Sequence, residues 1–500
     1  METAGKPQVL IAGAGPVGLT AAAELARYGI AVRIVDQAAQ RTDKSKALVL
    51  WSRTLELLDR AGCTPTLVAA GMRVTAANIM AGHERIARVD LTGIHSSYNF
   101  ALMLPQSQTE RLLEEHLGRL GIPVERRTEL TGFSQDSAGV TASLRHADGA
   151  GEAVRSEWLV ACDGARSLIR HTLGVPFTGE TLPSDWILAD CHLHGCPLSE
   201  SEIGVYWHED GTFVVFPISA GRFRVIADVP ASGTEHPPAP TLEQVQAVID
   251  RRGPSGCRAS DPVWLSTFRI NERKVDAYRV GRVLLAGDAA HIHSPAGGQG
   301  MNTGMQDAFN LAWKLALVCR GTCPERLLDS YSAERSAVGD TVLKAAGRLT
   351  RVATLKNHGA QALRNRIAHL VFGLSPVRHA FAENMSEVSI GYPASPLNGP
   401  GMHFTSGPAP GERVAPVAGA VAVGAGRVPR FALFANADAA SARLLARFPE
   451  LLEPAARAPL SRGGAWLVRP DGYLACAAAD DEIDAVGQYL DGLLARRSAG

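Results

Sequence analysis

The chain has 500 residues, which is too long for a single hydrophobic core, so two or three domains are expected. Hydrophobic residues make up 46% and charged residues 20%, as in a soluble globular enzyme. Because 50 Lys and Arg balance 50 Asp and Glu, the net charge is zero, which argues against nucleic acid or an anionic membrane as a partner.

The 8 cysteines are scattered and form no CxxC pair. Cys191 and Cys196, or Cys319 and Cys323, lack the second matching pair that a metal site would need. Reduced thiols of this kind are typical of a cytoplasmic protein, and a cytoplasmic location is our expectation. No stretch is long and apolar enough to span a bilayer.

The first predicted elements are a strand at residues 8–12, a helix at 19–28 and a strand at 30–35. This order predicts a parallel sheet with right-handed crossovers. The apolar run at 9–26 could also be a signal peptide, but Glu24 and Arg27 close it and its glycines are spaced for phosphate binding. We therefore assign the run to the fold.

A glycine-rich turn lies between this strand and helix and reads Gly13-Ala14-Gly15-Pro16-Val17-Gly18. A pyrophosphate needs backbone N–H groups and a helix N-terminus brought close, and side chains at the glycines would block that approach. Asp36 ends the next strand, about twenty residues on, where a carboxylate can accept bonds from ribose hydroxyls. The combination predicts dinucleotide binding, but it does not separate FAD from NAD.

Helices are predicted at 52–60 and at 108–120, where Gly121 ends the second. A strand at 157–162 then delivers a turn that begins at Asp163 and includes Arg166 and Arg170. An acid with nearby basic residues at a strand end suits a pyrophosphate. Taken alone, the segment is an ordinary Asp-Gly turn before a capped helix.

The character of the chain changes between about 182 and 268. Short alternating runs at 203–207, 212–216 and 223–228 predict antiparallel strands of a separate sheet. We expect a substrate pocket between this sheet and the cofactor. Its candidate wall residues are Tyr206, Trp207, His208, Phe213, Phe216 and Arg224, although an aromatic stripe on a strand is more often core.

Strand signals resume at 282–286 and lead into Gly287-Asp288, followed by a glycine-rich loop and a helix at about 300–320. The carboxyl end of a parallel strand is the usual ligand-binding edge, so Asp288 can bind the hydroxyls of a ribityl chain. The following helix can direct its positive N-terminus at the N1–C2=O edge of a reduced flavin. His291 and His293 lack a third metal ligand and are assigned to structure or pocket lining, so no metal is expected.

The last part of the chain begins with helical sequence at 338–372 and a Pro- and Gly-rich linker at about 393–416. Strands are predicted at 430–434 and 465–468, a turn at 470–472 and a final helix at 481–495. No CxxC is present there, which excludes dithiol redox chemistry.

Together the three motifs resemble the class A flavoprotein aromatic hydroxylases, typified by para-hydroxybenzoate hydroxylase. The resemblance covers about residues 7–345, and the tail around 466–473 is similar to the thioredoxin-like C-terminal domain of larger members. It implies an α/β fold in which a Rossmann-like FAD-binding domain carries an inserted antiparallel-sheet substrate domain. The implied divisions are 1–75, 100–180 and 269–345 for FAD, 76–99 and 181–268 for the sheet, 346–393 for a helical connection, and 394–500 for the thioredoxin-like domain.

The resemblance also implies the cofactor contacts. Many members have Arg-Ala where this chain has Lys46-Ala47, and lysine keeps the charge but loses the bidentate fork. Pro295 and the loop after it would border the flavin ring. The implied FAD-binding residues are Gly13, Ala14, Gly15, Pro16, Val17, Gly18, Asp36, Gln37, Lys46, Arg53, Gln106, Asp163, Gly287, Asp288, Pro295, Gly298, Gly300, Met301 and Asn302.

The family chemistry is hydroxylation of a phenolic or polyketide-type ring through a flavin C4a-hydroperoxide, with dioxygen as co-substrate and NADPH or NADH as transient reductant. No catalytic side chain is assigned, because the flavin carries the chemistry. Two alternatives stay open, namely a Baeyer–Villiger oxygenase on a polycyclic ketone and a non-catalytic flavin-binding regulatory protein. A homodimer is compatible with the sequence.

Overall fold

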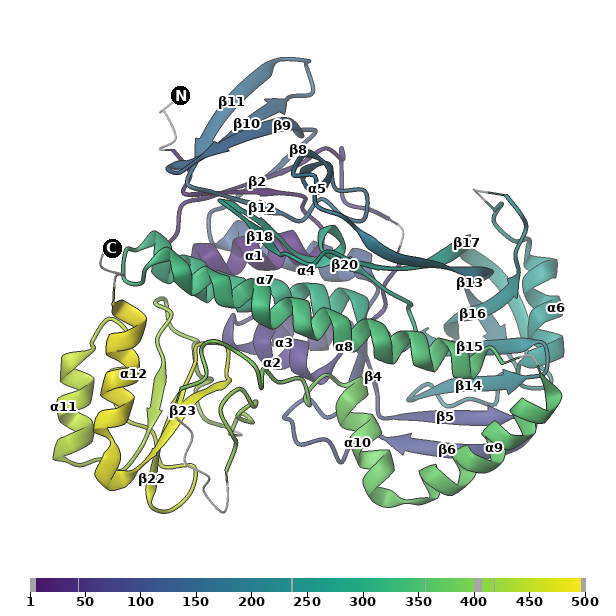
Figure 1. Ribbon diagram of the computed structural model, residues 1–500. Helices are drawn as coiled ribbons and strands as arrows, with labels where there is room; N and C mark the ends of the chain where they lie inside the picture. The colour runs from purple at the N-terminus through teal and green to yellow at the C-terminus, as the bar shows by residue number, and fades with distance from the viewer. Residues whose placement is uncertain are drawn as a thin grey trace.

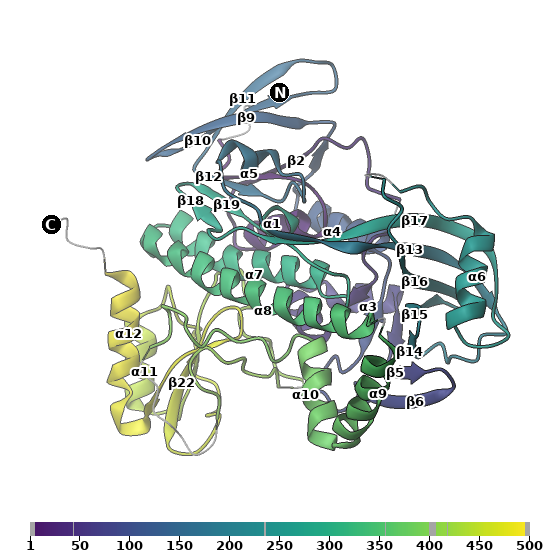
Figure 2. The same ribbon diagram turned by 45° about the vertical axis from the view of Figure 1, so that its right-hand side comes forward.

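The computed structural model describes residues 6–43, 45–234, 237–355, 357–399, 407–417 and 419–495. Figures 1 and 2 show three parts around the long helices α7 (Gly300–Cys319) and α8 (Asp329–Ala353). A parallel sheet lies above these helices in Figure 1, a large antiparallel sheet lies to the right, and a small sheet with two helices lies at the lower left. None of the helices in the described part of the chain is long and apolar enough to cross a membrane.

The first sheet has six strands in the order β18-β19-β12-β1-β2-β8. All neighbours are parallel except β18, which pairs antiparallel with β19. The strands are β1 (Val9–Ala12), β2 (Val32–Asp36), β8 (Val124–Arg126), β12 (Trp158–Ala161), β18 (Arg279–Val280) and β19 (Val283–Leu285). The helices of this part are α1 (Pro16–Arg27), α2 (Ser52–Arg60), α3 (Thr64–Ala70), α4 (Gln106–Arg119) and α5 (Leu168–Thr172).

The central strands of this sheet are buried on both faces, as parallel strands covered by helices should be. Their runs of three or four apolar residues are therefore continuous rather than alternating. The predicted strands at 8–12, 157–162 and 282–286 are observed with slightly shorter bounds, and the one predicted at 30–35 lies at 32–36. A three-stranded meander of β9 (Glu129–Asp136), β10 (Gly139–Arg145) and β11 (Gly151–Ser156) was not predicted.

The second large sheet has eight strands in the order β20-β17-β13-β16-β15-β14-β5-β6. Only the β14–β5 pair is parallel. The strands are β5 (Ala76–Ala81), β6 (Glu84–Asp90), β13 (Thr178–His194), β14 (Glu202–His208), β15 (Gly211–Ser219), β16 (Arg222–Pro230), β17 (Arg258–Lys274) and β20 (His291–Ile292). The 17-residue strands β13 and β17 of this sheet extend from the outer part back toward the parallel sheet, as Figure 2 shows.

Helix α6 (Leu242–Arg252) covers one face of this sheet, and α9 (His358–Gly373) and α10 (Ser375–Met385) lie at its β6 edge. The helical sequence predicted at 338–372 is divided between the end of α8 and α9. The chain breaks between α8 and α9, because the Asn357 side chain accepts the N–H of Ala360 and caps a new helix. A short three-stranded sheet of β3 (Val49–Leu50), β7 (Ala101–Met103) and β4 (Met72–Val74) connects the two large sheets.

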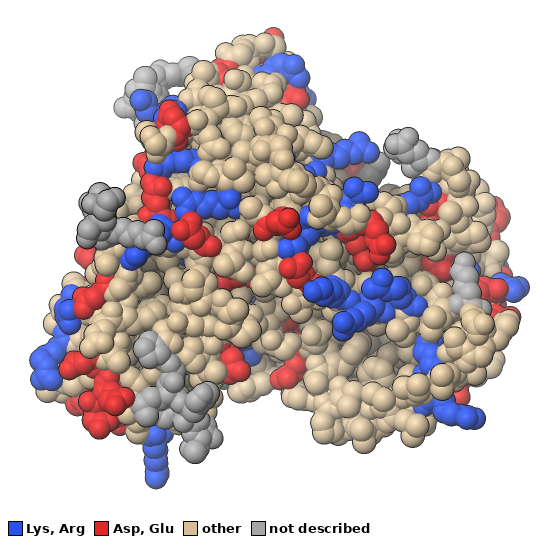
Figure 3. Space-filling view, viewed as in Figure 1, with Lys and Arg blue, Asp and Glu red and all other residues tan. Residues whose placement is uncertain are grey.

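The C-terminal part contains β21 (Ala432–Phe434), β22 (Gly464–Val468) and β23 (Leu474–Ala479) with α11 (Ala439–Arg447) and α12 (Asp484–Leu494). The β21–β22 and β22–β23 pairs are antiparallel, and residues 452–457 lie parallel to β21 on its other side. Of the predicted linker, residues 400–406 lie outside the described residues. Basic and acidic side chains are interspersed on the face shown in Figure 3, consistent with zero net charge.

Buried ion pairs join the C-terminal part to α7 and α8. The carboxylate of Glu334 accepts both terminal nitrogens of Arg469, at 2.7 and 3.0 Å, and the ammonium of Lys314 at 2.7 Å. Arg469 also donates to Asp471, which accepts the indole N–H of Trp313. All these side chains are buried, so the C-terminal part is an integral layer of the molecule rather than a tethered module.

Glu387 follows α10 and lies with positive φ against the first turns of α7. Its two carboxyl oxygens accept from Thr303 Oγ1 at 2.9 Å and Gln306 Nε2 at 2.5 Å. Burial raises the pKa of Glu387 to about 8. The folded protein therefore keeps this proton at pH values where the unfolded chain has lost it.

We predict a pH-dependent stability difference between the protein and its Glu387→Gln variant. Between about pH 4.5 and 8 the unfolded chain binds fewer protons at residue 387 than the folded protein, so rising pH destabilises the wild type through this group. Glutamine does not titrate, so the variant avoids this fall in the free energy of unfolding. The fall is at most on the order of 1.4 kcal/mol per unit of pKa shift. Urea unfolding at pH 6 and pH 9 should show the variant gaining relative to wild type at pH 9. Exposed Glu450→Gln serves as control, and identical pH slopes for Glu387→Gln and wild type would contradict the prediction.

Candidate functional site

The turn after β1 contains three glycines, and the physical reason that requires glycine differs between the positions. A Cβ on Gly13, whose φ is +100°, would lie 2.2 Å from the carbonyl oxygen of Cys162, and a Cβ on Gly18 would lie 1.9 Å from that of Gly13. These two glycines allow β1, α1 and β12 to pack closely. A Cβ on Gly15 meets nothing within 4 Å, so this glycine keeps space open in front of the α1 N-terminus.

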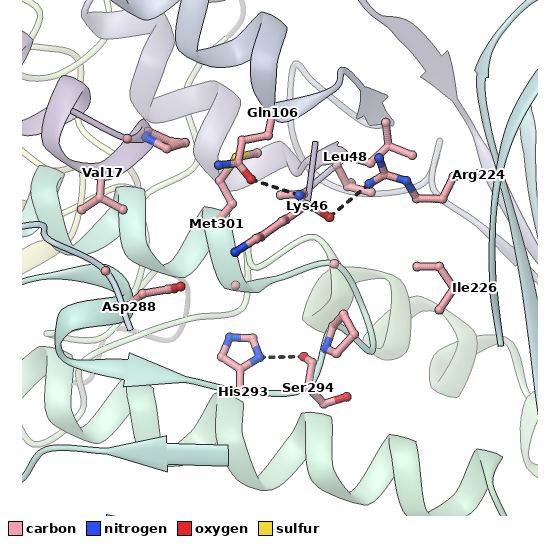
Figure 4. Close-up of a pocket in the computed structure, with 18 of the residues that line it drawn as sticks. Val17, Lys46, Leu48, Gln106, Arg224, Ile226, Asp288, His293, Ser294 and Met301 are labelled. Atoms are coloured by element: carbon pink, nitrogen blue, oxygen red, sulfur yellow. Dashed lines mark hydrogen bonds between the residues drawn. The ribbon is translucent and has the colours of Figure 1, made fainter. Parts of the chain in front are cut away.

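That space is a cavity of about 370 Å³, which we call the polar cavity. It lies between the N-termini of α1 and α7, and Figure 4 shows side chains from several elements converging on it. Its wall includes Gly15, Pro16, Val17, Lys46, Ala47, Gln106, Cys162, Gly164, Phe216, Arg224, Ile226, Asp288, His293, Pro295, Gly298, Gly300 and Met301.

Asp288 reaches the polar cavity from the turn after β19. Gly287 has φ of +59°, and a Cβ there would be 2.7 Å from Val17 Cγ2, so glycine lets this turn press against α1. Burial raises the pKa of Asp288, while His291 and Lys46 oppose the shift. In Figure 4 the Lys46 side chain points from the facing wall into the cavity toward Asp288.

The N-terminus of α7 forms another wall of the polar cavity. No side chain caps it, so its first N–H groups are available to a ligand, and a positive helix end favours an anion. Pro295, Gly298, Gly300 and Met301 line the cavity here. The predicted residue Asn302 does not: its side chain accepts the N–H of Trp51 and donates to the carbonyls of Val49 and Gly298, which fixes the loop.

Of the remaining predicted residues, some line the polar cavity and others lie beside it. Gln106 lines the cavity and accepts the N–H of Ala47, as Figure 4 shows. Asp163 lies beside the cavity residues Cys162 and Gly164, and its Oδ1 has no partner among the described residues. Asp36 accepts the N–H groups of Ala14 and Ala38 at the end of β2, next to the exposed Gln37.

The structure does not bring Arg53 to the polar cavity. Its guanidinium is buried on the opposite side of α2, where it donates to Glu56 and to the carbonyl of Asp471 and lies over the ring of Tyr473. Arg53 is thus a contact to the C-terminal part, which no local sequence pattern revealed.

His293, which the sequence assigned to structure or pocket lining, lines the polar cavity. Its Nδ1 donates to the carbonyl of Ser294 at 2.8 Å, because a carbonyl can only accept. Burial and the neighbouring His291 lower the pKa of His293 to about 4, so the ring is neutral at physiological pH. Its Nε2 is then an acceptor without a partner among the described residues.

A second cavity, the apolar slot, adjoins the polar cavity. The two share Phe216, Ile226 and Pro295. The rest of the slot wall is almost entirely apolar and consists of Trp51, Ala77, Ile79, Val89, Leu91, Trp186, Ile203, Val205, Trp207, Thr212, Val214, Ala296, Gly297, Leu349, Thr350, Ala353, Phe381 and Met385.

Three predicted pocket residues, Tyr206, His208 and Phe213, lie on the face of the sheet opposite the slot. Side chains alternate along a strand, so Val205 and Trp207 face the slot while Tyr206 and His208 face away. Tyr206 packs with Phe213 in the core under α6, at a ring distance of 6.0 Å. His208 lies at a surface turn 3.3 Å from Asp210, and this cluster with Glu209 is the only group of three candidate metal ligands among the described residues.

Arg224 lies where the sheet meets the polar cavity. Its Nε and one Nη donate to the two oxygens of Asp190 at 2.7 and 2.9 Å, and the other Nη donates to the carbonyl of Lys46 at 3.1 Å. The side chain is 1% exposed, and Figure 4 shows its bond to Lys46. This pair ties the segment that carries Lys46 to strand β16.

The comparisons with known proteins agree with this geometry. A family model described as an FAD binding domain matches residues 6–346. The chain is 37% identical to 6-methylpretetramide 4-monooxygenase of Streptomyces rimosus over 94% of this chain and 90% of that protein. It is 32% identical to pentachlorophenol 4-monooxygenase of Sphingobium chlorophenolicum over 72% of this chain and 66% of that protein. An anhydrotetracycline hydroxylase from Streptomyces rimosus superposes with a TM-score of 0.79 at 28% identity, covering 99% of this chain and 100% of that chain.

We predict that Gly15→Val abolishes FAD binding without unfolding the protein. The backbone of Gly15 has φ of −77°, which valine tolerates, and the new side chain would enter the space in front of α1. FAD content should fall at least about tenfold, the loss of one good phosphate contact or more, with the unfolding midpoint of the apoprotein unchanged. Gly132→Val in β9, which also meets nothing within 4 Å, is the matched control. Normal FAD content in Gly15→Val would show that the cofactor does not lie against the backbone of this turn.

Proposed function

Because the chain belongs to the class A flavoprotein aromatic hydroxylases, we propose that it hydroxylates a planar polycyclic aromatic molecule of the polyketide type, held in the apolar slot. The family makes it an FAD-dependent monooxygenase that acts on an aromatic ring with NADPH or NADH as reductant. The proposal therefore concerns the substrate class and the residues that receive substrate and cofactor.

The shape of the apolar slot carries the proposal. Its wall takes residues from β13, β16, β15, β14, β5 and β6, which are six adjacent strands. Neighbouring strands are about 4.8 Å apart, so the slot extends on the order of 20 Å across the sheet. The flat rings of Trp51, Trp207, Phe216 and Phe381 line it. An apolar slot whose wall spans six strands suits several fused rings better than one phenol ring.

The cofactor would lie along the polar cavity. The turn at Gly15 and the α1 N-terminus suit its pyrophosphate, and Asp36 suits the adenosine ribose. Asp288 suits the ribityl hydroxyls, and the uncapped N-terminus of α7 suits the negative edge of the reduced ring system. The unpartnered Oδ1 of Asp163 and Nε2 of His293 support a polar ligand here. When bound, reduced FAD supplies the oxygen atom, taken from dioxygen, that enters the substrate ring.

The chain itself contributes position and the exclusion of water. Phe216, Ile226 and Pro295 are shared by both cavities and would set the distance between the substrate ring and the cofactor. The apolar wall keeps water from the reacting atoms. Among the described slot residues we find no carboxylate or histidine, so no general base is assigned to the chain.

We also propose a domain assignment. The parallel sheet forms the FAD domain, the outer sheet forms the substrate domain and the C-terminal part is thioredoxin-like. The last point is supported by the strand order 452–457, β21, β22, β23, in which one parallel contact precedes two antiparallel ones. A homodimer and a cytoplasmic location stay predictions.

The substrate class can be tested with the purified holoenzyme. We expect 1,8-dihydroxyanthraquinone or a related polycycle to raise the rate of NADPH or NADH oxidation at least about tenfold, because binding in the slot completes the site, and to gain one oxygen by mass spectrometry. Phenol and 4-hydroxybenzoate should do neither. Stimulation by the single-ring phenols alone would contradict the polycyclic assignment, and a ring-expanded product by NMR would identify a Baeyer–Villiger reaction.

The length of the slot gives a second arm of the same test. Ala353 lines the slot where it packs against the cluster of Ile79 and Trp207, and Ala353→Trp should raise the KM for polycycles about tenfold by occupying ring volume. The neighbouring Val352 is 41% exposed, so Val352→Trp is the matched control and should leave the KM unchanged.

A further inference from the structure

Two cysteines lie side by side at the outer end of the antiparallel sheet. Cys196 lies just after β13 and Cys257 directly before β17, and these two strands pair antiparallel up to that end. A Cβ on Gly195 would lie 2.6 Å from the carbonyl oxygen of Gly256, so the two chain segments approach closely there. The thiol of Cys257 donates a hydrogen bond to the sulfur of Cys196. The two sulfur atoms are therefore neighbours, although β14, β15, β16 and α6 separate the cysteines in the chain.

The two thiols differ in exposure and in acidity. Cys196 is partly exposed and lies between the exposed residues Gly195 and Pro197, whereas Cys257 is 4% exposed and packs in the core under α6. Hydrogen bonds from Cys257 and from the backbone N–H of Leu198 stabilise the Cys196 thiolate and lower its pKa to about 7, although burial opposes the shift. The contact with Cys196, together with burial, raises the pKa of Cys257. At neutral pH Cys196 is therefore the nucleophile, and Cys257 keeps its proton.

The other cysteines have the opposite character. Burial raises the pKa of each of them, to about 12 at Cys63, Cys191, Cys319, Cys323 and Cys476. Cys319 is partly exposed like Cys196, so exposure alone does not make a thiol of this protein acidic. The adjacent second thiol distinguishes Cys196, and a low-pKa, accessible cysteine beside a second cysteine is the arrangement found in redox sensors.

We propose that Cys196 and Cys257 form a peroxide-sensitive pair that closes reversibly to a disulfide. The Cys196 thiolate attacks hydrogen peroxide, the O–O bond breaks, and one oxygen stays on the sulfur as a sulfenic acid while the other leaves as hydroxide and takes up a proton to form water. The sulfur of Cys257 then displaces the sulfenic oxygen, which leaves as a second water with the Cys257 proton. In sum, two thiols lose two electrons and two protons, and one peroxide becomes two water molecules.

The oxidant has a source in this protein, whatever the aromatic substrate is. Reduced flavin transfers two electrons to dioxygen and yields hydrogen peroxide when no substrate takes up the oxygen atom. A dithiol reductant reverses the disulfide by thiol exchange. The inference therefore does not depend on the identity of the ligand in the apolar slot.

The disulfide closes the part of the chain that forms much of the slot wall. Between the two cysteines lie β14, β15, β16 and α6. The three strands supply the slot residues Ile203, Val205, Trp207, Thr212, Val214, Phe216 and Ile226. A crosslink around a long segment restricts the unfolded chain and so stabilises the folded sheet. Oxidation of the pair thus makes the substrate domain more resistant to unfolding.

The test uses the purified holoenzyme, treated with hydrogen peroxide at pH 7. We expect the loss of two of the 8 thiols, a Cys196–Cys257 disulfide in non-reducing peptide mapping, and the return of both thiols with dithiothreitol. Before oxidation, iodoacetamide at pH 7 should alkylate Cys196 at least about 100-fold faster than Cys319. The larger thiolate population at Cys196 outweighs the lower nucleophilicity of a more acidic thiol.

Three serine variants separate the steps. Cys257→Ser keeps a hydroxyl donor but removes the second sulfur, so oxidation should stop at a Cys196 sulfenic acid that dimedone labels. Cys196→Ser should lose no thiol at the same dose of peroxide. Cys319→Ser changes another partly exposed thiol and should form the disulfide as the wild type does. The oxidised wild type should unfold at a higher urea concentration than oxidised Cys257→Ser.

Flavin content establishes that the variants are folded before oxidation. Equal alkylation rates at Cys196 and Cys319 would show that the paired thiol is not activated and would overturn the inference. Peroxide treatment that leaves both cysteines reduced, or that joins either of them to a different cysteine, would overturn it as well. None of these outcomes bears on the proposed substrate class, which depends on the slot alone.

Discussion

The contact between α7 and the turns that precede α1 and follow β19 is the constraint on which the site depends. Gly304 in α7 approaches so closely that a Cβ there would lie 3.0 Å from the Cα of Gly287 and 2.9 Å from Val17 Cγ2. Because of this close approach, two helix N-termini and the carboxylate of Asp288 face one cavity. A larger residue at either glycine would move α7 away from α1 and separate the groups that bind the two halves of the cofactor.

Polar contacts reinforce the same side of α7, in addition to its apolar packing. Asp307 accepts the Nε of Arg335 and the ring N–H of His291, and it also accepts the N–H of Gly287 at 3.0 Å. Buried ion pairs contribute little net stability because desolvation offsets their attraction, but they define position sharply. Asp307 therefore connects the turn that presents Asp288 to the helix that borders the same cavity.

Much of the parallel sheet and of the polar cavity could be predicted from the sequence, because glycine spacing and strand-end acids are local signals. The slot could not. A two-residue period shows that Tyr206 and Trp207 face opposite sides, but only the position of α6 decides which side is core. Arg53 and Glu334 look like ordinary charged residues of surface helices, and their partners Asp471 and Arg469 are more than a hundred residues away. The break before Asn357 was missed because a capping side chain interrupted an otherwise helical pattern.

The ion-pair cluster around Glu334 has a consequence for evolution and for protein engineering. Three of its members belong to α7 or α8 and two to the turn after β22, and each side holds one neutral ion pair, Lys314–Glu334 and Arg469–Asp471. The bonds between Glu334 and Arg469 cross from one side to the other, so the C-terminal part is not an interchangeable cassette. A chimera that exchanged this part between relatives would need to carry the matching residues of α7 and α8, or it would bury charged groups at the seam without their hydrogen-bond partners across it.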